Sequence, residues 1–572
     1  MIQSLKNNFI FFITIISLIS CNKELKSMQI TTSPNVPINT VPIISKYSNI
    51  PPNNSISVVT QHNNNSRSGL NDHESILNIN NVVSSLFGKQ FVLAVDDQVY
   101  AQPLVISNLK INNILHNVVL IATVNNTVYA YDAENGDAIW NKNFNPAFFR
   151  AVKNSDMTGA CGGNYVDFSG NMGIVGTPVI DSANNTIYFV TRITSGTGTY
   201  IQQLHATNII DGSELPNSPT TITAIYDGIG EGSKAGVLSF DAQKQNQRQA
   251  LTLTNGMVYI SFSSHCDWGP YHGWVLGYDS KTLTQKIVYN NTPNGYNAGI
   301  WESGMGMAVD AQGNLFCVTG NGSVGIPSDP TNLINRGESA LKLTPNANSL
   351  TVSSYFTPFN YPFLEQNDLD YGGLGAFLIP NTNLFFTGCK DGNFYILDKD
   401  HMGEYNQIAN NIHQTISLNN PGANMHCQPS YFKNTTNQFV YVWPENEPFH
   451  QIPINQNTQL FDMSLQRTYN VNGPVGQNGA VISVSSNGSI DNSGIVWVSH
   501  AVPPFDAEHG VRPGILRAFN ANDITKELWN SNMNYAIDGG GNYAKFSSPT
   551  IANGHVYLPT FSNQVVVYGI KQ

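Results

Sequence analysis

Short apolar segments recur along the whole chain, and each contains an aliphatic–aromatic or similar pair of residues. The second members of successive pairs lie roughly 56 to 71 residues apart, which is longer than a compact propeller repeat and fits repeats that carry insertions. The eight pairs are Val119-Leu120, Ile187-Tyr188, Val258-Tyr259, Leu315-Phe316, Leu384-Phe385, Val440-Tyr441, Val496-Trp497 and Val556-Tyr557. The pattern predicts eight structural units, each built around a buried strand.

Further strands are expected on both sides of these pairs. A proline stands near the start of the preceding segment in several units: Gln102-Pro103, Thr177-Pro178, Gln428-Pro429 and Ser548-Pro549. A second apolar segment often follows and ends near an acidic or amide residue: Asp132, Asp279, Asp398 and Asn520. Each unit therefore has three or four short strands.

Eight similar sheets arranged radially form an eight-bladed β-propeller, in which closure of the ring protects the strand edges. The last unit, 546–570, has only about three strands, so we expect Lys89–Val95 to supply the fourth and to close the ring. A stack of β-sandwiches is the structural alternative, but no long linker interrupts 87–572. The predicted fold class is therefore all-β, an eight-bladed propeller over 58–572.

Composition supports a large all-β protein and restricts its partners. Only 11% of the 572 residues are charged, whereas 48 are glycine and 29 are proline, as expected for strands joined by tight turns. The formal net charge is −11 with 27 Lys and Arg, which argues against binding a nucleic acid.

The N-terminal segment predicts export. Lys6 precedes an apolar run, Phe9–Ile19, that is shorter than the ~20 residues of a membrane-spanning helix, so 1–20 is interpreted as a signal peptide. Leu18-Ile19-Ser20-Cys21 resembles a bacterial lipobox, which implies lipidation of Cys21. The alternative is an ordinary secretory signal with an incidental cysteine. Residues 21–57, rich in Asn, Pro, Ser and Thr, are expected to be a disordered tether. These features predict a lipid-anchored protein of the bacterial cell envelope, at the outer membrane or on the periplasmic side.

The remaining cysteines and two polar clusters carry weaker signals. Without Cys21 the chain has an odd number of cysteines and no Cys-x-x-Cys, so a disulfide framework is not expected. His265, Cys266 and His272 have a spacing that fits no standard metal site. A polar insertion containing Asp506, Glu508, His509 and Arg512 is interpreted as a solvated loop.

The segment 118–140, VVLIATVNNTVYAYDAENGDAIW, resembles the repeat of pyrroloquinoline quinone (PQQ) dehydrogenases. In that repeat the position of Trp140 is a structural tryptophan that docks one blade on the next. The chain also resembles uncharacterised secreted proteins with this repeat, through 62–69 (HNNNSRSG) and 265–274 (HCDWGPYHGW). This second resemblance implies a fold and not an activity.

Comparison with active PQQ dehydrogenases implies a site of five residues. Asp267 and Asn321 stand where the family has its Ca²⁺ ligands, and Trp301 stands near its quinone-stacking tryptophan. Asp370 matches the catalytic aspartate, and Lys390 matches the basic residue at the quinone oxygen. Ca²⁺ prefers carboxylate and amide oxygens, so this donor set is chemically coherent. The chain lacks the adjacent Cys-Cys pair of many members and has no haem motif Cys-x-x-Cys-His, so a dehydrogenase would need an external electron acceptor.

Two classes of function follow from these observations. The first is a PQQ- and Ca²⁺-dependent dehydrogenase of alcohols or sugars. The second is a non-catalytic propeller, either an envelope assembly scaffold with a protein partner or a surface-binding module. Each of the five residues also has a structural interpretation, such as a turn residue or a core tryptophan. If the five side chains converge at one mouth of the propeller channel, a shared site is favoured over these separate structural interpretations.

Overall fold

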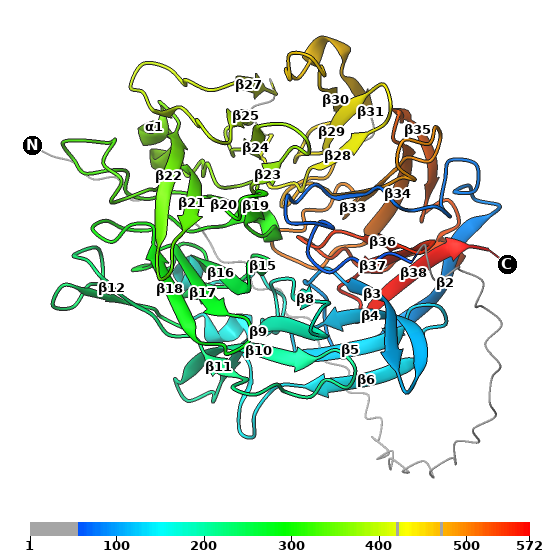
Figure 1. Ribbon diagram of the computed structural model, residues 1–572, viewed down its shortest axis with the longest axis horizontal. Coiled ribbons are helices and arrows are strands. Elements are labelled where there is room, and N and C mark those ends of the chain that lie inside the picture. Colours follow the sequence, from blue (N-terminus) through cyan, green and yellow to red (C-terminus); the bar gives the residue numbers. More distant parts are fainter. Residues whose placement is uncertain (1–54, 419–422, 470–472, 572) are drawn as a thin grey trace, which may run out of the picture. The chain divides into compact units, whose positions relative to one another are not determined.

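The structure, a computed structural model that describes residues 55–418, 423–469 and 473–571, contains eight sheets of four or five strands and one separate hairpin (Figure 1). Each sheet is one blade of a propeller, and its strands are mostly antiparallel. Blade 1 contains β3 (Leu104–Ile111), β4 (Ile114–Ala122), β5 (Thr127–Asp132) and β6 (Ala138–Asn143). Blade 2 contains β8 (Val179–Asp181), β9 (Thr186–Thr194), β10 (Tyr200–Asn208) and β11 (Thr220–Thr221), with β7 (Arg150–Ala151) added to β9.

Blades 3 to 5 follow in chain order. Blade 3 contains β14 (Gln245–Asn246) and β15 (Thr252–Thr254), both on β16 (Met257–Ser264), then β17 (Trp274–Asp279) and β18 (Gln285–Asn290). Blade 4 contains β19 (Ala308–Val309), β20 (Leu315–Val318), β21 (Ala340–Pro345), β22 (Leu350–Thr357) and β26 (Glu404–Tyr405). Blade 5 contains β23 (Phe377–Leu378), β24 (Leu384–Gly388), β25 (Asn393–Asp398) and β27 (Gln414–Ser417).

Blades 6 to 8 complete the ring. Blade 6 contains β28 (Ser430–Lys433), β29 (Gln438–Val442), β30 (Phe449–Pro453) and β31 (Arg467–Tyr469). Blade 7 contains β1 (Leu70–Asn71), β32 (Val481–Ser485), β33 (Ile495–Ala501), β34 (Gly514–Asn520) and β35 (Asp523–Asn530). Blade 8 contains β36 (Thr550–Ala552), β37 (His555–Pro559), β38 (Gln564–Ile570) and β2 (Phe87–Ala94). The hairpin is β12 (Ile225–Asp227) with β13 (Val237–Ser239), and the described α-helices are α1 (Tyr361–Gln366) and α2 (Tyr535–Asp538).

The predicted all-β, eight-bladed fold is confirmed. All eight apolar pairs lie in the second strand of a blade, from β4 to β37, and the segments that follow them form third strands such as β5 and β17. The prolines stand just before the innermost strands β3, β8, β28 and β36, where a missing backbone N–H removes no bond within the strand. The ring closes as predicted, because β2 pairs antiparallel with β38 from Phe87 opposite Ile570 to Ala94 opposite Gln564.

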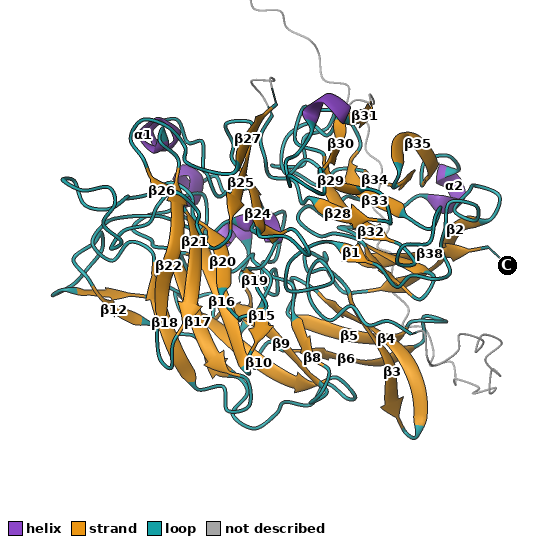
Figure 2. Ribbon diagram, turned by 45° about the horizontal axis from the view of Figure 1, so that its top comes forward, coloured by secondary structure: helices purple, strands orange, loops and turns teal. Residues whose placement is uncertain are grey.

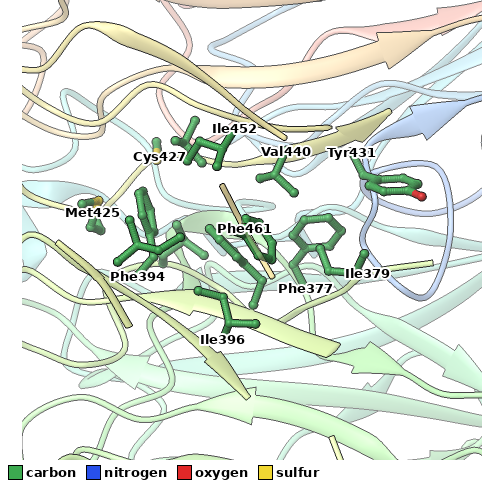
Figure 3. Packing of buried hydrophobic residues seen from close by; sticks show 14 of the residues in the cluster. Phe377, Ile379, Phe394, Ile396, Met425, Cys427, Tyr431, Val440, Ile452 and Phe461 are labelled. Atoms are coloured by element: carbon green, nitrogen blue, oxygen red, sulfur yellow. The ribbon is translucent and has the colours of Figure 1, made fainter. Parts of the chain in front are cut away.

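The core consists of layers between neighbouring blades. Strands such as β29 are buried on both faces, which explains why they lack a simple alternation of apolar and polar residues. Figure 3 shows one layer, in which Phe377 and Phe394 of blade 5 meet Val440 and Ile452 of blade 6. At the outer edge of blade 1, the indole Nε1 of Trp140 donates to the Ile209 carbonyl of blade 2 at 2.9 Å. The predicted docking role of Trp140 between blades is therefore confirmed.

A polar segment, Val58–Asn71, runs along the inside of the ring, and we call it the inner collar. Its last residues form β1, which lies parallel to β32 (Figure 2). The inner collar hydrogen-bonds to the innermost strand of every blade. In the order of blades 1 to 8, the bonded pairs are Val58 with Val105, Val59 with Ile180, Asn65 with Leu253, Asn65 with Val309, Ser66 with Leu378, Ser68 with Tyr431, Gly69 with Val484 and Asn71 with Ile551. The inner collar thus links all eight blades. In the sequence, only its residues 62–69 stood out, through their resemblance to secreted proteins with the PQQ repeat.

Residues 1–54 lie outside the described part of the chain, so the signal peptide 1–20, Cys21 and nearly all of the tether 21–57 do too. Ile56 and Ser57 are described, and both hydrogen-bond to the propeller, to Asn553 and Ser107 respectively. Among the described residues, no helix has the length and apolar character needed to span a bilayer.

Candidate active site

All five predicted site residues lie at one mouth of the propeller, in the successive blades 3, 4 and 5. Asp267, Asn321 and Lys390 follow the ends of the second strands β16, β20 and β24. Trp301 and Asp370 precede the innermost strands β19 and β23. Because the first two strands of a blade are antiparallel neighbours, the end of one and the start of the other lie at the same edge. Strand topology thus brings together residues that span more than one hundred positions.

Asp370 is the centre of the network. Its side chain is buried, with 5% of the residue exposed, and its Oδ1 accepts a hydrogen bond of 2.8 Å from the Asn321 backbone N–H. Its Oδ2 lies 2.6 Å from Nζ of Lys390. The same ammonium is 3.5 Å from Oδ1 of Asp368. Three of the five predicted residues are therefore in direct contact, in an arrangement that fixes both oxygens of one carboxylate.

The Asn321 side chain presents an uncommitted oxygen. Its Nδ2 donates to Oδ1 of Asp368 at 2.6 Å, which determines how the amide is turned. Its Oδ1 is buried and accepts no hydrogen bond from any described residue. A buried amide oxygen without a donor is uncommon in proteins, and it suits a hard cation such as Ca²⁺.

Asp267 lies at the solvent-exposed edge of the site. Its Oδ1 accepts a hydrogen bond of 2.5 Å from the Tyr271 hydroxyl, and its backbone has a φ of 47°, which non-glycine residues rarely adopt. Loss of hydration, followed by repulsion from Asp370, raises the pKa of Asp267 to about 6. The carboxylates of Asp267, Asp368 and Asp370 thus share one small region.

Lys390 is the only cation that pairs with these carboxylates among the described residues. Burial alone would lower its pKa, but attraction to Asp370, Asp368 and Asp267 outweighs burial and holds the pKa of Lys390 above its ordinary value. The lysine therefore stays protonated. Three carboxylates opposite one ammonium leave an excess of negative charge that favours a divalent cation.

Trp301 lies against this network with part of its surface exposed. Its ring centroid is 6.5 Å from that of Tyr271, edge to face, and 5.7 Å from the guanidinium carbon of Arg248. A Cβ at Gly320 would come within 2.2 Å of Oδ1 of Asp370 and 2.9 Å of Cδ1 of Trp301. Only glycine therefore allows the β20 turn to pass between the indole and the carboxylate.

The residues present fit both groups that the resemblance implies. Carboxylate oxygens and the free amide oxygen of Asn321 are ligands of the kind that Ca²⁺ prefers. The accessible indole of Trp301 beside a protonated Lys390 suits a flat, electron-poor quinone. The roles of the five residues as metal ligands, stacking partner and base remain predictions.

The expectation of no disulfide framework needs a correction, because Cys161 and Cys266 are disulfide-bonded. They are 105 positions apart in the sequence, so no local spacing could have indicated the pair. The bond attaches the segment 150–172, which leads into blade 2, to the residue directly before Asp267. In the same region Tyr165 hydrogen-bonds to Nδ1 of His265 at 2.7 Å.

The other polar clusters of the sequence take different roles. His272 hydrogen-bonds to Thr292 and to the Glu231 carbonyl. Asp506, Glu508 and His509 lie on a partly exposed loop with their potential ligand atoms within 4.8 Å of one another, a proximity that the sequence did not predict. Sequence reasoning also missed Arg248 at Trp301, because an isolated arginine between two glutamines gives no spacing signal.

Comparison with known proteins defines the class of fold. No protein-family model and no curated protein matches the sequence. The structure is similar to the quinohemoprotein alcohol dehydrogenase from Comamonas testosteroni, with a TM-score of 0.56 and 13% identity over 90% of this chain and 80% of that chain. It is equally similar to a europium-containing methanol dehydrogenase, with a TM-score of 0.56 and 12% identity over 90% and 98% of the two chains.

BamB from Moraxella catarrhalis also matches, with a TM-score of 0.45 and 10% identity over 85% of this chain and 98% of that chain. The chain is an eight-bladed β-propeller, a fold that it shares with the two dehydrogenase structures. At such low identities the similarity shows the fold alone.

Proposed function

We propose that the protein is a PQQ- and Ca²⁺-dependent dehydrogenase of alcohols or sugars that passes electrons to an external acceptor. The observation that carries this proposal is the contact network of Asp370, Asn321 and Lys390, in which the buried Oδ1 of Asn321 has no donor among the described residues. A role as an assembly scaffold would not require a charged network of this kind at the mouth of the channel.

In the proposed reaction, bound PQQ would supply the acceptor for the hydride that leaves the alcohol carbon. Asp370 takes the proton from the substrate hydroxyl. The Asn321 N–H and the Lys390 ammonium each hold one oxygen of Asp370, so the carboxylate keeps a fixed orientation before substrate arrives. Asn321 and Asp267 would hold Ca²⁺, Lys390 would face a quinone oxygen, and Trp301 would hold the quinone ring by stacking.

Reconstitution tests the proposal. Purified protein is mixed with PQQ and Ca²⁺, and binding and dye reduction are followed over a panel of alcohols and sugars. We expect Asn321→Ala to weaken Ca²⁺-dependent PQQ binding by about tenfold or more, because it removes the free amide oxygen. We expect Asp370→Asn to retain the cofactor but to lose roughly 10²-fold or more in turnover, because it removes the base.

The matched control is Asn332→Ala, a substitution in an exposed loop of blade 4, which should change neither binding nor turnover. Absence of PQQ binding to the wild-type protein at saturating Ca²⁺ would reject the dehydrogenase and leave the non-catalytic propeller. Equal turnover in Asn321→Ala and Asp370→Asn would favour the same alternative.

We further propose that the protein is exported and lipid-anchored through Cys21 at the bacterial cell envelope. The disulfide between Cys161 and Cys266 supports export, because such bonds persist mainly in oxidising compartments. Cys21→Ser should abolish acylation and release the protein from membranes, as measured by mass spectrometry of the mature N-terminus and by membrane fractionation. Unchanged membrane partition together with an N-terminus that carries no lipid mass would refute the anchor.

A further inference from the structure

A cavity of about 540 Å³ is lined by β13 of the separate hairpin, by β10 and β11 of blade 2 and by the start of β17 in blade 3. The hairpin lies at the periphery of the ring, where β12 contacts β18 of blade 3 (Figures 1 and 2). None of the five predicted site residues lines this cavity. Tyr271 contacts both regions, because it lines the cavity and its hydroxyl donates to Asp267. The cavity is therefore a neighbour of the candidate active site and not a part of it.

Hydrogen bonds to blade 3 hold the loop of the hairpin in place. The Gly230 N–H donates to the Pro293 carbonyl at 2.8 Å, and the Glu231 N–H donates to the Gly295 carbonyl at 2.7 Å. Nε2 of His272 donates to the Glu231 carbonyl at 2.9 Å. The cavity is therefore preformed, so a ligand would not have to order this loop when it binds.

The charges around the cavity balance. Two lysines, Lys234 and Lys244, and two acids, Glu231 and Asp241, line it. Burial lowers the pKa of the fifth titratable side chain of this kind, His272, which keeps the imidazole neutral at neutral pH. An anion or a cation would meet as many like charges as opposite ones, so the lining suits a ligand without net charge.

Several hydrogen-bonding groups of the lining are uncommitted. The hydroxyls of Thr221, Thr223 and Ser239 lie at exposed positions and bond to no described residue. Gln245 is only 2% exposed, and its buried Oε1 has no donor in the described part of the chain. A buried amide oxygen without a donor is uncommon in proteins. The lining therefore offers both donors and acceptors to a ligand.

Phe240 adds an apolar surface among these polar groups. It is half-buried, and its ring packs edge to face against Phe262, with centroids 4.9 Å apart, and against Trp274 at 6.3 Å. Packing on two sides fixes the ring in one orientation. A fixed aromatic ring beside free hydroxyls suits a molecule that has both C–H faces and many polar groups.

We propose that this cavity is a binding site for a neutral saccharide. Each hydroxyl of a sugar both donates and accepts hydrogen bonds, which matches the mixed lining, and the C–H face of a sugar ring can pack against Phe240. A lipid would leave the polar groups of the lining unpaired, which is unfavourable. The site does not depend on the proposed dehydrogenase activity.

The test uses the purified protein without PQQ and without added Ca²⁺, so no substrate is turned over. The probes are three neutral trisaccharides: maltotriose, cellotriose and tri-N-acetylchitotriose. Trigalacturonate is the charged saccharide control, and triglycine is a zwitterion without sugar rings. Calorimetry should give a Kd of about 1 mM or lower for at least one neutral trisaccharide, and binding at least about tenfold weaker for both controls.

Variants locate the bound saccharide. Ser239→Trp fills the cavity from an exposed position and should abolish binding, whereas Ser349→Trp, in the exposed turn between β21 and β22, is the matched control and should leave binding unchanged. Phe240→Ala should weaken binding by about tenfold, but it also removes a packed ring. Lys234→Ala is therefore added, because the Lys234 ammonium pairs with no described residue. It should weaken binding by about threefold without a change in melting temperature.

Three results would overturn the site. The first is that none of the neutral trisaccharides binds, and the second is that Ser239→Trp binds a saccharide as tightly as wild type does. The third is that trigalacturonate or triglycine binds more tightly than every neutral probe. Saccharide binding by a protein that fails to bind PQQ at saturating Ca²⁺ would refute the proposed dehydrogenase and leave this site standing.

Discussion

Glu302 follows Trp301 directly and is completely buried. Its Oε1 accepts the Val318 N–H at 3.1 Å, while its Oε2 has no partner among the described residues. Burial, opposed in part by Arg67, raises the pKa of Glu302 from 4.5 to about 8. The carboxyl group is therefore mostly protonated at neutral pH, and it supports the Trp301 side of the site as a neutral group.

This raised pKa predicts a pH dependence of stability. Between pH 4.5 and about 8 the folded protein keeps a proton on Glu302 that the unfolded chain has released. The free energy of unfolding should therefore fall as the pH rises through this range, by at most about 1.4 kcal/mol per pH unit from this group. Glu302→Gln keeps the shape without the titration, so it should lose less stability than wild type between pH 5 and pH 8.

The measurement is urea unfolding at several pH values, compared between wild type and Glu302→Gln. Glu404→Gln, which changes an exposed glutamate, is the control and should keep the wild-type slope. Identical slopes for wild type and Glu302→Gln would show that Glu302 does not hold its proton in the folded protein.

At the residue scale, the sequence predicted the part of the site that repeats a family pattern. Asp370, Asn321 and Lys390 lie in turns next to recognisable strands, and the structure places them in contact. Arg248, which lies against Trp301, was missed because it belongs to none of these motifs.

At the scale of single elements, strand length decides what can be predicted. The second strands carry apolar pairs because both of their faces are buried, so all eight were found. The innermost strands β19 and β23 have two residues each, too few to show any periodicity. The segment 150–172 was also unassigned, because its attachment to blade 3 depends on a disulfide between distant cysteines.

Docking of blades through their outermost strands gives a prediction at this scale. Trp140 of β6 covers the turn of blade 2, since a Cβ at Gly212 would lie 2.8 Å from its ring. Trp140→Ala should lower the free energy of unfolding by roughly 2 kcal/mol, less than for a fully buried tryptophan because the side chain is only half-buried. Ile114→Ala, at an exposed position of β4, should change it by about 0.5 kcal/mol or less. Urea unfolding of both variants checks this, and similar losses would contradict docking by Trp140.

At the scale of the whole molecule, two segments from the N-terminal part of the chain hold the ring together. β2 completes blade 8, which was predicted because its apolar residues match the missing strand. The inner collar was not predicted as a structural element, since it binds mostly through backbone groups, which leave no pattern of side chains. It pairs with the last residues of β19 and β23, whereas Trp301 and Asp370 precede these strands. The collar and the candidate site therefore lie at opposite ends of the innermost strands.

Gly69 allows a test of the collar by one substitution. Its φ is 68°, and a Cβ there would lie 2.1 Å from Oγ of Ser430, which itself donates to the Ile482 carbonyl at 2.8 Å. Gly69→Ala should therefore push the collar away from blades 6 and 7 and lower the free energy of unfolding by roughly 2 to 4 kcal/mol.

Gly162→Ala separates this clash from backbone strain alone. Gly162 has a similar φ of 63°, but a Cβ there would meet no described atom within 4 Å, so its substitution should cost only about 1 to 2 kcal/mol. Hydrogen exchange should report where the difference arises. In Gly69→Ala, the amides of Tyr431 and Val484, which donate to the collar, should exchange faster than in Gly162→Ala. Equal stability losses and equal exchange in the two variants would mean that the collar fills the channel without holding the blades together.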